Sequence, residues 1–92
     1  MQILTLPPAL DLRAAGALVT NFNAARGNHV TIDASKVEKI GTQCVQVLLS
    51  AQVTWARDGV PLALANPSEA FLESLDILGI PLNKIAEQEH SK

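Results

Sequence analysis

Short apolar runs alternate along this chain with longer segments in which apolar residues recur every three or four positions. Residues 2–6 form a short apolar run closed by Pro7 and Pro8, which predicts a brief first strand. Asp11 is a candidate N-cap, and the helical spacing that follows it predicts a helix ending near Gly27. The apolar positions expected on the buried face of this helix are Leu12, Ala15, Leu18, Val19, Phe22 and Ala25.

The middle of the chain repeats the order of strand and helix. Residues 29–33 are rich in β-branched side chains and predict a buried strand that ends at Asp33. Residues 41–57 are apolar through their middle, so we expect a helix that lies heavily against a sheet. Asp58 and Gly59 then provide its end, because glycine readily takes the left-handed conformation that closes helices.

The last third predicts one more strand and helix. Residues 60–65 are a further apolar run. Asn66 is a candidate N-cap with Pro67 at the first helical position and Glu69 three residues after the cap, so the sequence predicts a helix from here to Gly79. Leu72, Leu75 and Leu78 continue this helix. We expect a short edge strand over 80–85 and a frayed polar tail over 86–92.

Strands that alternate with helices on short loops predict an α/β fold, with a small mixed sheet of about four strands and packed helices. The 92 residues contain no visible linker or repeat, so we expect a single domain over 1–92. With 48% hydrophobic and 17% charged residues, the composition is that of a compact globule. Aromatic residues make up only 3%, so the core must be mainly aliphatic.

Charge and hydropathy exclude several function classes. A net charge of −2 and scattered basic residues argue against nucleic acid as the main partner, because phosphate backbones are bound by clustered Lys and Arg. No apolar run approaches the roughly 18 residues that a membrane span needs, and we expect no direct membrane insertion. The first residues lack the features of a signal peptide, so a cytoplasmic location is expected.

The sequence offers little for catalysis. His29 lies on a predicted strand and His90 in the tail, and we expect structural roles for both. A single cysteine, Cys44, excludes an internal disulfide and cannot hold a metal ion alone, so neither a metal nor a cofactor is expected. Cys44 is interpreted as a small buried residue, with a redox thiol at a helix N-terminus as the alternative. Trp55 is expected to be half-exposed, or to anchor a partner at a rim.

The most informative feature is the stretch where the buried strand ends, a short loop follows and the long helix begins. Its first turn presents the hydroxyl of Thr42, which is either a helix N-cap or a phosphoacceptor. A phosphate there would add about −1.5 to −2 charge and could accept hydrogen bonds from the first amides of the helix. The residues predicted to bind a partner are Lys39, Gly41, Thr42, Gln43 and Gln46.

A second hydroxyl in the same region belongs to Ser35. Together with Asp33 it is expected to organise a turn, because Asp and Ser bond readily to nearby backbone groups. The neighbouring charged residues Lys36, Glu38 and Lys39 are interpreted as a solvated loop, and they would also surround any surface that a partner binds next to Thr42.

These motifs resemble those of a known family. The order Ile32-Asp33, a short loop, Gly41-Thr42-Gln43-Cys44-Val45 and an aliphatic helix resembles the STAS domain, the fold of bacterial anti-sigma-factor antagonists. Family members usually carry Asp-Ser-Ser-Gly or Asp-Thr-x-Gly at this loop, where a partner kinase phosphorylates a hydroxyl. In this chain Gly41 stands at the usual Asp, Gln43 at the common phosphoacceptor and Cys44 at the glycine, so only Thr42 keeps a hydroxyl.

The resemblance implies a protein partner. We expect a non-enzymatic signalling module that binds a histidine or serine/threonine kinase or a related regulator around Thr42. Segments 32–35, 47–52 and 66–71 are similar to small STAS proteins that accompany chemotaxis kinases. Two alternatives stay open, a subunit of a lipid-transport ATPase complex and a classical anti-sigma-factor antagonist. Assembly into a homodimer also stays open.

Overall fold

The computed structural model describes residues 2–81, 85, 87 and 88. Its strands are β1 (Gln2–Thr5), β2 (Ala9–Leu10), β3 (Val30–Asp33), β4 (Lys39–Ile40), β5 (Leu62–Ala65) and β6 (Glu87–Gln88). Its helices are α1 (Leu12–Ala24), α2 (Thr42–Asp58) and α3 (Glu69–Ile77). Strands and helices thus alternate along the chain, as the apolar pattern predicts.

The main sheet has four strands in the order β1-β3-β5-β6, and β2 pairs with β4 in a small second sheet. The predicted α/β fold with about four strands is confirmed, but the described pairs are all parallel rather than mixed. A helix lies in each connection between neighbouring strands of the main sheet, and such crossovers return the chain in the same direction.

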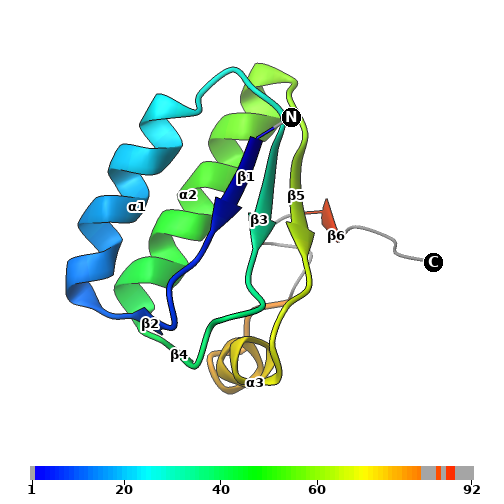
Figure 1. Cartoon of the computed structure of the whole chain (residues 1–92). Coiled ribbons are helices and arrows are strands. Elements are labelled where there is room, and N and C mark those ends of the chain that lie inside the picture. The colour runs from blue at the N-terminus through cyan, green and yellow to red at the C-terminus, as the bar shows by residue number, and fades with distance from the viewer. Residues whose placement is uncertain (1, 82–84, 86, 89–92) are drawn as a thin grey trace.

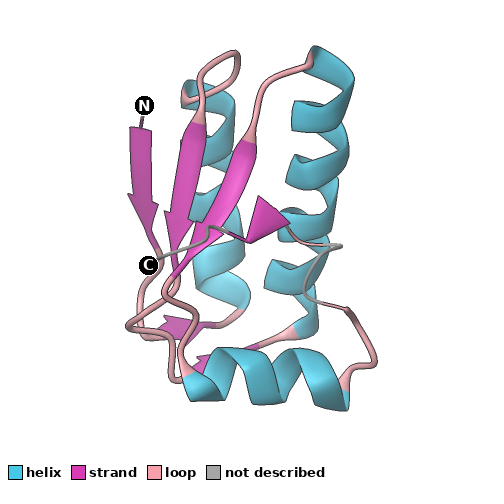
Figure 2. Ribbon diagram, turned by 90° about the vertical axis from the view of Figure 1, so that its right-hand side faces the viewer, coloured by secondary structure: helices cyan, strands magenta, loops and turns pink. Residues whose placement is uncertain are grey.

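The helices form one layer and one end piece. Helices α1 and α2 lie side by side on one face of the sheet, and α3 lies across the end toward which β1, β3 and β5 point (Figures 1 and 2). The core lies between the sheet and the two-helix layer, where Val30, Ile32 and Leu64 are fully buried. Leu18 of α1 and Leu48 of α2 are buried among these side chains in one apolar cluster. The largely aliphatic core is therefore confirmed.

The prediction of a single buried face on α1 is partly wrong. Leu18, Phe22 and Ala25 are buried, but Leu12 is 71% exposed and Val19 is 45% exposed. The apolar stripe of α1 is wider than the surface that the sheet and α2 offer it. Two apolar side chains are therefore left facing solvent on the outer side of the helix layer.

The predicted start of α3 is also displaced. Ser68, not Asn66, is the N-cap, and its Oγ accepts a hydrogen bond of 3.1 Å from the Phe71 amide. Asn66 has a φ of 52° and belongs to the turn before the helix. The serine side chain is held in place because its hydroxyl also donates to the Val37 carbonyl. A contact distant in sequence therefore selects the cap.

The predicted ends of α2 and α3 are confirmed, but the strand expected after α3 is not found at the described residues of that segment. Gly59 and Gly79 adopt positive φ and close their helices as predicted. Ile80 and Pro81 are not in a strand, because the Ile80 amide donates to the Leu75 carbonyl at the end of α3. Residues 82–84 of the expected edge strand lie outside the described residues. The last strand is instead β6, within the segment expected to fray.

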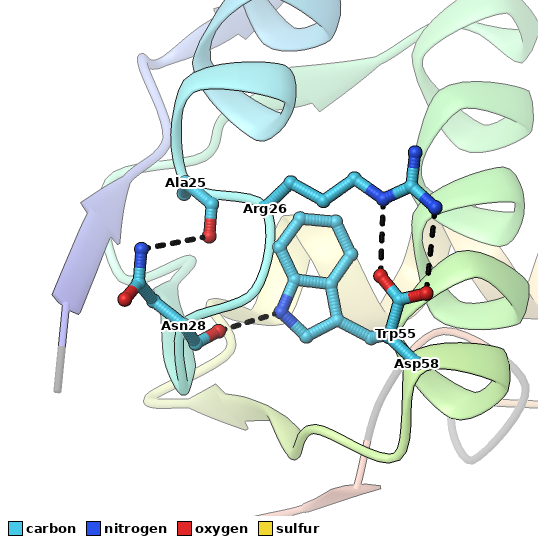
Figure 3. A network of polar contacts seen from close by, with 5 residues as sticks. All are labelled: Ala25, Arg26, Asn28, Trp55 and Asp58. Carbon is cyan, nitrogen blue, oxygen red and sulfur yellow. Dashed lines mark hydrogen bonds and ion pairs between the residues drawn. The ribbon is translucent and has the colours of Figure 1, made fainter.

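Trp55 lies at the end of α2 opposite to Thr42, and the expectation of a half-exposed side chain is wrong. It is 2% exposed, packs edge-to-face on Phe22 with 5.6 Å between ring centroids, and donates from Nε1 to the Asn28 carbonyl at 2.8 Å (Figure 3). Next to it, Arg26 and Asp58 form a two-pronged ion pair, with Nε 3.0 Å from Oδ2. These contacts fasten the chain after α1 to the end of α2.

Candidate functional site

The candidate site is built where the chain leaves the carboxyl end of β3. Asp33 ends the strand, and its Oδ1 accepts a hydrogen bond of 3.0 Å from the Ser35 amide. This bond, with the Ser35 hydroxyl and the charge of Lys36, keeps the pKa of Asp33 below its usual value, so the carboxylate is ionised at neutral pH. The predicted turn at Asp33 and Ser35 is confirmed.

The loop between β3 and α2 is fastened on two sides. On one side the Glu38 amide donates to the Pro8 carbonyl at 2.7 Å and the Gly41 amide to the Leu10 carbonyl at 2.8 Å. On the other side the Ser68 hydroxyl donates to the Val37 carbonyl at 2.6 Å. Val37 itself is buried. The loop therefore presents a preformed surface.

Thr42 is the first residue of α2, and the interpretation of Thr42 as the N-cap is wrong. Gly41 occupies the cap position in an extended conformation and supplies no side-chain bond. The reason is that Gly41 continues the pairing of β4 with β2, which fixes where the extended chain ends. The first helical bond runs from the Val45 amide to the Gly41 carbonyl, so the amides of residues 42–44 point out of the helix end. Thr42 itself is exposed at this helix end.

All five residues predicted to bind a partner are exposed: Lys39, Gly41, Thr42, Gln43 and Gln46. Lys39 lies on β4, Gly41 is the N-cap of α2, and the other three lie on the first two turns of that helix. We call these five residues the docking surface. Sequence reasoning missed its apolar neighbour, Leu12, which lines a depression together with Gln43 and Gln46.

Leu12 lies beside the docking surface for a topological reason. The parallel register of Leu10 with Ile40 brings the starts of α1 and α2 side by side. Two residues after this pair, Leu12 opens α1 and Thr42 opens α2. Helical periodicity assigned Leu12 to the core, and only the strand register reveals it as a surface residue.

Cys44 joins the two helix starts from within. It is buried, and its Sγ donates to the Asp11 carbonyl at 3.2 Å. Burial and the nearby Asp11 carboxylate raise the pKa of the thiol above its ordinary value. The interpretation of Cys44 as a small buried residue is confirmed, and the reactive thiolate that a redox role requires is disfavoured at neutral pH.

The structure gathers few groups that could do other chemistry. His29 is exposed at the start of β3, and His90 lies outside the described residues. Within the described part of the chain, no three His, Cys, Asp or Glu side chains come together as a metal site would require. Among those same residues, no helix has the length and apolar character to span a membrane.

Comparison with known proteins agrees with this geometry. A family model described as "Mlab, STAS domain" matches residues 2–81. A crystal structure from Thermotoga maritima, described as that of an anti-sigma factor antagonist, matches with a TM-score of 0.71. The match covers 97% of this chain and 80% of that one at 19% sequence identity, so the likeness is one of fold. A search of curated proteins gave no significant match.

Proposed function

Because the chain belongs to the STAS domain family, we propose that it is a non-enzymatic signalling module that binds a protein kinase or a related regulator through the docking surface. In this proposal residues 1–92 act as one domain in the cytoplasm, and the partner is a histidine or serine/threonine kinase. A chemotaxis kinase is the more specific form of the proposal.

One observation carries the proposal: Thr42 is exposed at the start of α2, next to a loop that is already held in place. A preformed surface loses little conformational freedom on binding, which favours recognition by a protein partner. Leu12 adds an exposed apolar side chain next to Gln43 and Gln46, and partially apolar surfaces with a polar rim are typical of protein interfaces.

Thr42 also suits control by phosphorylation. A serine/threonine kinase would transfer the γ-phosphoryl group of ATP to the Thr42 oxygen, with loss of the hydroxyl proton and release of ADP. The new dianion would lie beside the outward-pointing amides of the first helical turn, where negative charge is stabilised. It would at the same time place charge within the partner interface, and an unpaired buried charge is costly there. Phosphorylation is therefore expected to release the partner.

The test is a binding assay with purified kinases from the host of this protein. The immobilised proteins are the wild type, Thr42→Glu and the matched control Thr20→Glu, which changes an exposed threonine of α1. We expect wild type and control to retain one kinase and Thr42→Glu to bind it at least roughly tenfold more weakly. Failure of all three proteins to bind any kinase, or equal binding by the two variants, would contradict the proposal.

The same assay separates the alternatives. A transport ATPase or an anti-sigma factor from the host, assayed in parallel, would identify either other role if it bound in place of a kinase. Intact mass of the protein purified from its own host provides a second readout. A gain of one phosphate, mapped to Thr42 by peptide fragmentation, is the result expected if the modification occurs.

A further inference from the structure

A groove lies between α1 and α2, the two helices that run side by side in Figure 1. Two depressions that share Val19, Val47 and Ser50 make up this groove, and it extends over about three helical turns. We call it the helix-face groove. Val19 at its centre is 45% exposed and Leu12 at one end is 71% exposed.

The walls of the helix-face groove carry almost no charge. Among the described residues that line it, Arg26 is the only one that is charged, and its guanidinium is paired with Asp58 at the far end. The polar residues along the walls are hydroxyls and amides, which both donate and accept hydrogen bonds. A second copy brings the same side chains, so apart from the paired Arg26 it meets no charged residue of the groove and can pair amide with amide.

Gly16 provides an independent observation. It lies in the middle of α1, is exposed and lines the groove, and a Cβ added there would meet no atom within 4 Å. A glycine inside a helix costs roughly 0.5–1 kcal/mol relative to alanine, and no contact among the described residues requires it. Its small size does permit the close approach of another backbone to α1.

The area of this face fits a weak dimer. Helix α1 has 13 residues and α2 has 17, so they extend roughly 20 and 25 Å and are each about 10 Å wide. Their combined outer face is therefore roughly 400–500 Å² per copy, or roughly 800–1,000 Å² for two copies. This total lies below the roughly 1,200 Å² at which stable specific interfaces begin, in the range of weak and transient ones.

We infer that the helix-face groove is the contact surface of a weak two-fold homodimer, in which two helix layers pack on each other around Val19. In such an interface the same patch serves both copies. One end of the groove shares Gln43 and Gln46 with the docking surface. The inference is nevertheless made without assuming the proposed kinase partner, because it rests on Val19, Gly16 and the uncharged walls.

The test is sedimentation equilibrium of the full chain at concentrations up to roughly 1 mM, where weak dimers are populated. The variant is Val19→Lys, and the control is Ile77→Lys, which changes an apolar residue of α3 that is 82% exposed and lies outside the groove. The mass of wild type and control should rise with concentration from 9.8 kDa toward twice that value, and Val19→Lys should stay at 9.8 kDa. A rise in ionic strength to about 0.5 M should not dissociate the dimer, because its contacts are uncharged.

A second variant guards against loss of folding. Gly16→Gln places a larger, uncharged side chain in the groove and is expected to stabilise α1 while weakening the dimer at least roughly tenfold. Circular dichroism checks that each variant is folded. A wild type that stays monomeric throughout, or dimerisation of Val19→Lys equal to that of Ile77→Lys, overturns the inference and leaves the groove to another occupant.

Discussion

Gly59 at the end of α2 and Gly16 in the middle of α1 differ in whether the backbone requires a glycine. Gly59 closes α2 with a φ of 71°, a left-handed conformation that costs other residues energy because their Cβ approaches the carbonyl oxygen. Gly16 has ordinary helical conformation, and the space beside it is open. Glycine is therefore required by the backbone at position 59, whereas no neighbour in the described part of the chain requires it at position 16.

The two positions predict opposite effects of the same substitution. Gly16→Ala should raise the free energy of unfolding by about 0.5–1 kcal/mol, and Gly59→Ala should lower it by about 1 kcal/mol. Urea denaturation at low protein concentration, followed by the fluorescence of Trp55, measures both. Destabilisation by Gly16→Ala would show that another part of the chain uses this glycine.

At the scale of elements, the ends of α2 and α3 were predictable and the faces of α1 were not. Gly59 and Gly79 close helices because glycine readily takes the left-handed conformation, a local preference that can be read from the sequence alone. The exposure of Leu12 and the choice of Ser68 over Asn66 depend on neighbours distant in the sequence, namely the β2–β4 register and the Val37 carbonyl. The position of Thr42 at the start of α2 follows from the local sequence and could be predicted. The depression that Leu12 forms with Gln43 and Gln46 depends on contacts between distant segments and could not.

Two contacts join the end of α2 to the chain that leaves α1, the buried Trp55 and the ion pair of Arg26 with Asp58. We expect Trp55 to contribute more to the free energy of unfolding. Trp55→Phe removes a buried hydrogen-bond donor and part of a buried ring, and should lower the free energy of unfolding by about 2 kcal/mol. Arg26→Gln removes only the exposed ion pair, and its effect should be smaller and screened by salt. Chemical denaturation followed by circular dichroism compares the two variants.

The ion pair also has a pH signature. The hydrogen bond from Arg26 keeps the pKa of Asp58 below its value in the unfolded chain. The ion pair therefore stabilises the fold fully at a pH above the pKa that Asp58 has in the unfolded chain. This contribution is lost as the pH falls through the folded pKa of Asp58. The difference in stability between wild type and Arg26→Gln should therefore vanish in acid, whereas the deficit of Trp55→Phe should remain.

At the scale of the whole molecule, one core joins all three helices to the sheet. Phe71 and Leu75 of α3 belong to the same apolar cluster as Leu48 of α2 and Ile32 of β3. The loop between β3 and α2 lies between α3 and the segment before α1. The Ser68 hydroxyl donates to its Val37 carbonyl, and the carbonyls of Pro8 and Leu10 accept from its Glu38 and Gly41 amides. A chain assembled in this way is expected to unfold as one unit.

Ser68→Ala tests this cooperativity. The variant loses the cap of α3 and the bond to Val37, so the free energy of unfolding should fall by about 1–2 kcal/mol, whereas Ser50→Ala on the exposed side of α2 should change little. Trp55 lies at the opposite end of α2, and its fluorescence reports a region distant from the lost contacts. In a single domain the fluorescence midpoint shifts with that of circular dichroism. Separate midpoints by the two methods would show that α3 unfolds apart from the rest of the chain. The loop between β3 and α2 would then be held only while α3 is folded.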